Sequence, residues 1–248
     1  MFKFKINKPN PKIIAVDFLL LVALGVFGYT TYNWYFNPVE SKTVELNNKI
    51  VSKITSRNYK DEIKDLKSKY EDVVGILEIP NTEFKRVFVQ SKDNTYYLKK
   101  NLNKQKDKNG VPFMDYQVNL DSRKLVIYGH NSRFTEMPFN YLMNYYDEDY
   151  FNDNKYIDIK TDQGTLRYEV FSVFTETTET HDWSYKDVNF ENDEAYEANI
   201  ESMKNKSIFK KDFDTKDKQI LVIQTCSTKK DVLKYPQRFL VIVAGRVN

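Results

Sequence analysis

Short apolar runs separated by polar turns occupy most of the chain beyond residue 73. The runs are rich in Val, Ile, Phe and Tyr, the residues that favour β-strands. They cover residues 74–79, 84–90, 124–128, 156–160, 166–174, 219–225 and 239–243. Helical patterns fall between some of them, at 94–99, 137–145 and 191–205, without the regular alternation of a βαβ fold. The pattern predicts a mainly β fold with inserted helices, either a barrel or a sandwich of largely antiparallel strands.

Residues 13–36 form an apolar segment long enough to cross a bilayer. Four lysines precede it, aromatic residues crowd its far end, and Asp17 is its only acid. This pattern predicts a cytoplasmic basic tail at 1–12, a transmembrane anchor at 13–36, and the rest of the chain outside the cell. The alternative is a cleaved signal peptide, but the small residues at 23–25 come early for a cleavage site.

The region between the anchor and the first strand, residues 37–72, has apolar side chains at helical spacing. It predicts one or two amphipathic helices ahead of a single domain at 73–248. Beyond residue 36 the basic and acidic residues balance, which does not favour nucleic acid as a partner. The sequence has no metal-binding cluster, phosphate-binding loop or haem motif, so we expect no metal and no cofactor.

The only cysteine, Cys226, stands where the apolar run 219–225 becomes polar. Exported proteins usually pair their cysteines, so a single one indicates a free thiol or an intermolecular bridge. A buried cysteine that acts as a small hydrophobic residue is the alternative. A cysteine at the end of a buried strand lies at the rim of the core, where a nucleophile can meet a substrate.

Histidine is nearly as scarce, with His130 and His181 alone. His130 follows the apolar run 124–128 after a single glycine, whereas His181 lies in a polar stretch that predicts a solvated loop. Elimination therefore makes Cys226 and His130 the candidate nucleophile and base.

A hairpin argument provides the third candidate. If the last two apolar runs are neighbours joined by a turn centred near Val232, Cys226 lies directly opposite Arg238. Side chains so opposed have Cβ atoms about 5 Å apart, which would bring the guanidinium over the thiol. A slip of one residue would place Arg238 on the other face of the sheet.

These residues stand in ordered motifs: Tyr128-Gly129-His130-Asn131, Thr225-Cys226, and Arg238 ahead of Val241-Ile242-Val243. Further blocks are Ile79-Pro80-Asn81-Thr82, residues 89–94 with Tyr97-Leu98, residues 110–115, and Phe190-Glu191-Asn192-Asp193. From about residue 74 to 247 the chain resembles the sortases, cysteine transpeptidases of Gram-positive cell surfaces, and class B among them. One motif departs from the family pattern, because Gln224 replaces the usual small residue two positions before the cysteine.

The resemblance implies a closed β-barrel preceded by N-terminal helices and a transmembrane anchor. It also implies that Cys226 attacks the carbonyl of a Thr in a C-terminal sorting motif of secreted surface proteins. His130 would then protonate the leaving amine, and Arg238 would stabilise the oxyanion. A cell-wall amine, on peptidoglycan or lipid II, would resolve the thioester. The residues implied to line the peptide groove are Asn94, Leu98, Thr178 and Thr225.

Other functions stay open at this point. A hydrolytic cysteine peptidase could use the same three side chains, with water in place of the amine. The substrates of a sortase could be haem-uptake proteins or pilins, and the latter would make the enzyme a pilin polymerase. A membrane-tethered binding protein with an incidental cysteine is the non-enzymatic alternative.

Overall fold

The computed structural model describes residues 21–31, 42–54, 58–180 and 182–248. The chain divides into two units, Met1–Val39 and Glu40–Asn248. In the first unit, residues 21–31 form a helix whose side chains are exposed. Among the described residues, no helix combines the length and the apolar character that a membrane crossing requires. The basic tail and the remainder of the expected anchor, residues 1–20 and 32–36, lie outside the described residues.

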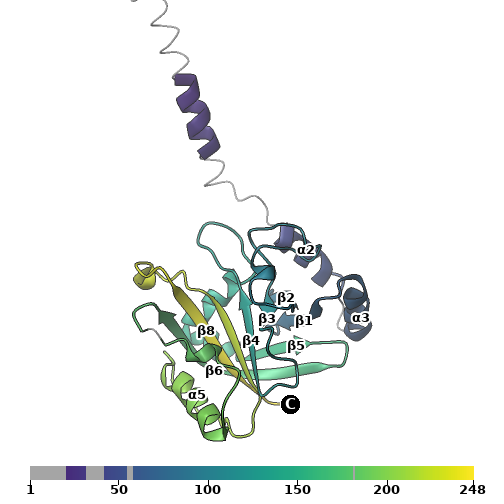
Figure 1. The fold of residues 1–248 in the computed structure, drawn as a ribbon, viewed down its shortest axis with the longest axis vertical. Helices are drawn as coiled ribbons and strands as arrows, with labels where there is room; N and C mark the ends of the chain where they lie inside the picture. Colours follow the sequence, from purple (N-terminus) through teal and green to yellow (C-terminus); the bar gives the residue numbers. More distant parts are fainter. Residues whose placement is uncertain (1–20, 32–41, 55–57, 181) are drawn as a thin grey trace, which may run out of the picture. The chain divides into compact units, whose positions relative to one another are not determined.

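In the described part of the second unit, eight strands close into a barrel in the order β1-β2-β3-β4-β7-β8-β6-β5 (Figure 1). The strands are β1 Val73–Glu78, β2 Lys85–Val89, β3 Phe113–Met114, β4 Lys124–Gly129, β5 Tyr156–Lys160, β6 Thr165–Thr177, β7 Ile220–Cys226 and β8 Arg238–Arg246. Pairing of β5 with β1 closes the ring. The pairs β2/β3 and β4/β7 are parallel and the others antiparallel. A barrel, rather than a sandwich, is therefore the fold.

Each of the seven predicted strands is present, with ends that differ by a few residues. The prediction missed β3, because two residues are too few to stand out as an apolar run. It also ended β6 at residue 174, whereas the strand continues to Thr177 through polar residues that still pair with β8.

Alternating side chains of the central strands fill the barrel and cover its outside. The inner set includes Leu125, Ile127, Leu221, Ile223, Leu240 and Ile242. The outer set includes Val126, Val222, Val241 and Val243, which are buried in a second cluster with residues of η3 (Ser184–Lys186) and α5 (Asp193–Asn205). Burial of each aliphatic side chain contributes about 1.5–3 kcal/mol, so both faces of these strands hold them in place.

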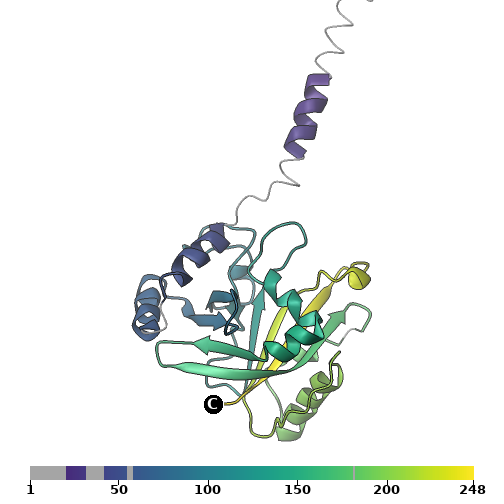
Figure 2. The same ribbon diagram turned by 180° about the vertical axis from the view of Figure 1, so that it is seen from behind.

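Helical segments complete the domain. They are α2 Lys42–Val51, α3 Tyr59–Lys69, η1 Tyr96–Leu98, η2 Asn140–Tyr146, α4 Glu148–Asp153 and η4 Lys230–Val232. Helices α2 and α3 lie on the side of the barrel away from α5, as the two opposite views show (Figures 1 and 2). They are the amphipathic helices that the sequence predicted.

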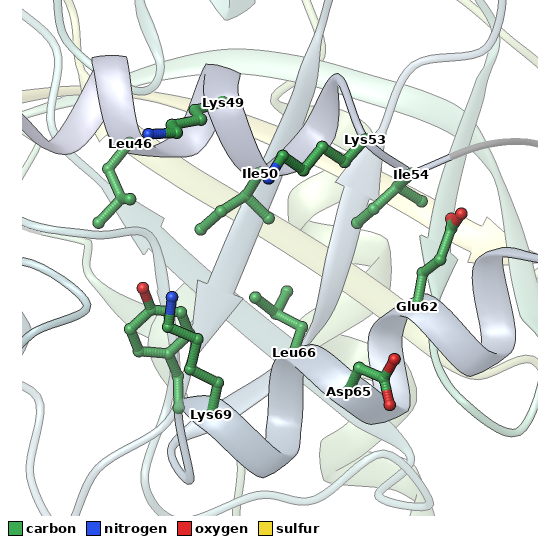
Figure 3. Close-up of a pocket in the computed structure, with 10 residues that line it drawn as sticks. Leu46, Lys49, Ile50, Lys53, Ile54, Glu62, Asp65, Leu66 and Lys69 are labelled. Carbon is green, nitrogen blue, oxygen red and sulfur yellow. The ribbon is translucent and has the colours of Figure 1, made fainter.

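Buried apolar side chains and several polar contacts hold α2 and α3 to the rest of the domain. Ile63 and Leu66 of α3 are buried against β1 and β2. In α2, the Asn47 side chain accepts a hydrogen bond from the Val87 amide at 2.8 Å and donates one to the Lys85 carbonyl at 3.0 Å. Between the two helices is a hollow of about 350 Å³, into which Leu46, Ile50, Ile54 and Leu66 point (Figure 3).

Candidate active site

The parallel pair β4/β7 places the candidate cysteine and histidine at one edge of the barrel. The two strands are in register from their first residues to Gly129 opposite Thr225. His130 is the next residue after Gly129, and Cys226 is the next after Thr225. Neighbouring strands are about 4.8 Å apart, so the two residues lie side by side at this edge of the sheet. The two strand ends that the sequence singled out are therefore adjacent.

Two side chains link the backbones of these strand ends. The Thr225 hydroxyl donates to the Gly129 carbonyl at 2.8 Å. The Asn131 amide nitrogen donates to the Cys226 carbonyl, also at 2.8 Å. Each bond runs from one strand end to the other, so the position of Cys226 depends on the backbone on both sides of His130.

Gly129, the residue before His130, lets an aromatic ring pack directly against its own backbone. A Cβ atom at Gly129 would lie 2.4 Å from the Phe139 ring, too close for any other residue without displacement of that ring. The Phe139 amide in turn donates to the His130 carbonyl at 3.0 Å. The motif Tyr-Gly-His thus needs its glycine for packing.

The imidazole of His130 is held by η1. Its Nε2 lies 2.8 Å from the Leu98 carbonyl oxygen. A carbonyl only accepts, so Nε2 carries the hydrogen and Nδ1 is left to exchange a proton. Gly110 supports this arrangement, because it has φ +58° and a Cβ there would lie 2.9 Å from the same Leu98 oxygen.

Cys226 has a free, half-buried thiol. Burial raises the pKa of the Cys226 thiol, and the nearby positive charge of Arg238 lowers it in part. The thiol is thus more fully protonated at neutral pH than an exposed cysteine, and its thiolate needs stabilisation from the site.

Arg238 does not lie opposite Cys226, and the hairpin prediction is wrong by one residue. Phe239 is the residue opposite Cys226, and Arg238 pairs with Thr177 of β6. The centre of the hairpin lies between Val232 and Leu233 because η4 occupies the connection. Arg238 is therefore on the inner face of β8, the same face as Leu240. Cys226 is on the outer face of the barrel, as is Phe239.

The guanidinium of Arg238 still acts on the thiol from the rim of the barrel. Its Nε donates to the Ser227 carbonyl at 3.1 Å and its Nη1 to the Tyr235 carbonyl at 2.8 Å. These bonds use two of the five N–H groups of an arginine side chain. Arg238 is not among the residues that line the cleft beside Cys226, and its link to the thiol is the effect of its charge on the thiol pKa.

A cleft of about 390 Å³ surrounds the thiol. Its walls come from η1, β3, β4, η3, β7 and β8. The lining residues are Asn94, Leu98, Phe113, Tyr128, Gly129, His130, Lys186, Gln224, Cys226 and Phe239. The structure thus brings Cys226, His130, Asn94 and Leu98 together in one concave site, the form expected of a substrate pocket.

A buried carboxylate fixes the wall near Asn94. Asp115, 2% exposed, accepts from the Asn94 amide nitrogen at 2.7 Å and from the Tyr128 hydroxyl at 3.1 Å. Burial, and then the charge of Asp115, raise the pKa of the Tyr128 phenol far above its ordinary value. Both side chains are therefore held as neutral, oriented groups at the edge of the cleft.

A family model of the sortase domain matches residues 77–247. The chain belongs to the sortase family. Sortase B of Listeria monocytogenes is 29% identical over 229 residues, or 87% of this chain and 91% of that protein. A crystal structure of Clostridium perfringens sortase B is 31% identical, with a TM-score of 0.67, and covers 75% of this chain and 99% of that one. A mutant form of the same protein gives 28% identity and a TM-score of 0.71, covering 82% and 97%.

Sortases are cysteine transpeptidases of the cell surface, so the chain is an enzyme of that kind. The relatives matched are of class B, which confirms the resemblance drawn from the motifs. Among the described residues, no group of His, Cys, Asp and Glu side chains is placed to hold a metal ion.

Two of the residues expected to line the groove of the sortase are not in the cleft. Thr225 is 1% exposed, because the alternation of β7 turns it into the barrel. Thr178 follows β6, where its amide donates to the Gln237 carbonyl at 3.1 Å, and it is not among the residues that line the cleft. The Thr225 side chain instead bonds the Gly129 carbonyl and so positions the strand end.

Gln224 of the sortase does face the cleft, two residues before Cys226 on the same side of β7. The Tyr185 hydroxyl donates to its amide oxygen at 2.9 Å. This bond uses the amide oxygen of Gln224 and leaves the two N–H donors of its amide nitrogen for other hydrogen bonds. The replacement of a small residue by glutamine thus adds a donor group to the cleft wall.

Sequence reasoning missed Lys186 and Phe239, which form the wall on the β8 side. The ammonium of Lys186 lies 4.9 Å from the centre of the Phe239 ring and 5.0 Å from that of Trp183. The aromatic residues beside Lys186 in the sequence were the available sign of such a site. His181, which the sequence placed in a solvated loop, lies outside the described residues.

Proposed function

We propose that this sortase uses Cys226 as its nucleophile, His130 as its general acid and base, and Arg238 to stabilise the oxyanion. The observation that best supports the proposal is the register of β4 and β7, which sets Gly129 opposite Thr225. A thiol and an imidazole that follow paired positions of adjacent strands share one cleft, as a nucleophile and its base must.

In the first step the thiolate of Cys226 forms a bond to the carbonyl carbon of a Thr in a C-terminal sorting motif. The C–N bond of the scissile peptide breaks, and the charged imidazole of His130 gives a proton to the leaving amine. Because the hydrogen on Nε2 is held in a hydrogen bond to the Leu98 carbonyl, we assign this proton transfer to Nδ1. The product is a thioester between the Thr and Cys226.

In the second step an amine of the cell wall, on peptidoglycan or lipid II, attacks the thioester carbonyl. Nδ1 of His130 takes a proton from this amine, and the thiolate of Cys226 leaves. A covalent intermediate divides one difficult amide exchange into two easier steps.

Arg238 supplies the charge for both tetrahedral intermediates. Two backbone carbonyls, of Ser227 and Tyr235, accept hydrogen bonds from its guanidinium and hold it at the rim of the barrel. Donors fixed in advance toward the developing oxyanion are worth about 3–4 kcal/mol in a transition state. The effect of Arg238 on the Cys226 pKa supports its placement within electrostatic reach.

The cleft offers a path for the sorting peptide between Asn94 and Leu98 on one side and Phe239 on the other. We further propose that Thr178, at the end of β6, contacts the peptide where it leaves the cleft.

The apolar sequence of residues 13–36 supports a single-pass anchor, with residues 1–12 in the cytoplasm. The helical segment 37–72 and the catalytic domain 73–248 would then lie outside the cell. Protease added to intact cells stripped of peptidoglycan should digest the catalytic domain, and protection of that domain would contradict the orientation.

A ligation assay tests the proposed reaction. The full-length chain is mixed with fluorescent peptides of the type Asn/Ser-Pro-x-Thr-Asn/Gly and a cell-wall peptide that carries a free amine. We expect a product in which the Thr carbonyl is joined to the added amine, and none with Cys226→Ala. The proposal would be refuted if the chain cleaved none of these peptides, or if the Cys226→Ala chain gave as much ligated product as the wild type.

A further inference from the structure

Lys186 carries a positive charge that nothing in the described structure neutralises. Its ammonium lies against an aromatic cradle, which we define as Trp183, Tyr185 and Phe239, with ring centres at 5.0, 5.5 and 4.9 Å. Cation–π contacts of this length hold an ammonium in place but leave its N–H donors unused. Lys186 makes no ion pair with any residue of the described ranges.

The acidic side chains of the same region are already engaged. Glu176 and Asp182 both pair with Lys206, at 2.8 and 2.5 Å. Asp187, next to Lys186 in the chain, is exposed. Burial lowers the pKa of the Lys186 ammonium, the shift of a partly desolvated cation without an opposite charge beside it. A bound anion would remove that penalty.

Lys186 faces the same cleft as Cys226 but from the side opposite His130. The strand order is β4, β7, β8, with His130 after β4, Cys226 at the end of β7, and Phe239 opposite Cys226 on β8. Lys186 lies over the Phe239 ring, so the thiol stands between Lys186 and the imidazole. The charge that lowers the Cys226 pKa is that of Arg238 and not that of Lys186, so the thiolate is not the partner of Lys186.

This placement assigns the anion to one half of the substrate. The leaving amine and the incoming amine both exchange protons with His130, so both occupy the β4 side of the thiol. The other half, the acyl segment that ends in Thr, is left for the β8 side. We propose that Lys186 is a substrate-binding residue that recognises a carboxylate on the acyl segment of the sorting peptide, an acidic side chain within or just before the motif. The inference rests on the proposed function.

Paired peptides that differ by one charge test this inference with the full-length chain. Each pair has Glu or Gln either at the variable position before Thr or at the residue just before the motif, and a third version has Lys there. We expect the wild-type chain to prefer Glu over Gln at one of these positions by about tenfold in kcat/KM, the effect of one charged hydrogen bond.

Three variants at one position separate recognition of charge from support of the cleft wall. Lys186→Met should abolish the preference for Glu, Lys186→Arg should retain it, and Lys186→Glu should shift it toward the Lys peptide. The Gln peptide serves as the internal reference, since a damaged cleft would lower all three peptides alike. Lys155→Met is the matched control, because Lys155 also lies over an aromatic ring, Tyr156 at 5.1 Å, but is exposed outside the cleft.

Equal use of Glu and Gln peptides by the wild-type chain would overturn the inference and leave the proposed function standing. A preference for Glu that survives Lys186→Met would also overturn it. So would an effect of Lys186→Met that depends on a carboxylate on the acceptor amine and not on the sorting peptide. A wild-type chain that cleaves none of the peptides would instead refute the proposed function, and this inference with it.

Discussion

Cys226 has two different kinds of neighbour on its two sides. Toward β4, hydrogen bonds from Thr225 and Asn131 join the backbones of adjacent strand ends at 2.8 Å. Toward β8, the neighbours act through long side chains, the guanidinium of Arg238 and the ammonium of Lys186. The first side is held by the sheet itself and suits proton transfer, which tolerates little misplacement. The second side is adjustable and suits contact with the acyl segment and its oxyanion.

Loss of the imidazole should have the largest effect on the β4 side. His130→Ala should lower kcat/KM by about 10³-fold, within the range that removal of a general acid or base produces. Steady-state cleavage of a sorting peptide measures it. His181→Ala, at the other histidine of the chain, should be nearly silent. An equal loss in the two variants would mean that the base has been assigned to the wrong residue.

On the β8 side, loss of the Arg238 guanidinium should have the largest effect on activity. Arg238→Ala should lower activity by about 10²-fold or more, and Arg238→Lys should retain part of it, since lysine keeps the charge without the planar donors. The loss should fall mainly on kcat, because the oxyanion exists only in the transition state and intermediate. Arg246→Ala, at the far end of β8, is the control. A rise in KM with kcat unchanged would make Arg238 a substrate-binding residue.

A smaller effect should follow from cutting one link between the strand ends. Thr225→Val keeps the shape of the side chain but removes the donor to the Gly129 carbonyl. We expect a loss of about 1 kcal/mol in the free energy of unfolding, measured by urea titration, together with a drop in kcat. Thr215→Val provides the control, since Thr215 lies in the connection between α5 and β7 and does not line the cleft. Unchanged activity with lowered stability would show that this link serves the fold alone.

The smallest predicted effect is on the titration of the thiol. In the free enzyme the pKa of Cys226 should lie above that of an exposed cysteine, because burial disfavours the thiolate. Arg238→Ala should raise that pKa further, since it removes a positive charge that favours the thiolate. The rate of alkylation by iodoacetamide as a function of pH measures both values. A pKa that falls in Arg238→Ala would contradict the placement of the guanidinium near the sulfur.

The two sides of the thiol also differed in how far the sequence could predict them. Cys226 and His130 each end an apolar run, and a run that is continuous marks a buried strand whose end must reach the rim. That the two strands are adjacent and parallel did not follow from the runs, because strand order depends on the whole barrel. The family resemblance supplied the closed barrel, and the structure supplied the pairing of the two strands.

Register across the β7–β8 hairpin was beyond the sequence for a local reason. The connection contains the short helix η4, and one residue more or less in such a turn moves Arg238 to the other face. The sequence analysis missed the cleft wall formed by Lys186 and Phe239. These residues are far apart in the sequence, and η3 contacts β8 only in the folded domain. The burial of Thr225 was not foreseen, because a motif does not state which way its side chains point.

Direct capture of the thioester tests the central claim, that Cys226 is the nucleophile. The full-length chain is mixed with a sorting peptide in the absence of an amine acceptor, quenched in acid, and analysed by intact mass and peptide mapping. We predict an added mass equal to the acyl half of the peptide, located on Cys226, released by hydroxylamine and absent from Cys226→Ala. Cleavage of the peptide by Cys226→Ala, or an adduct on any other residue, would contradict the account.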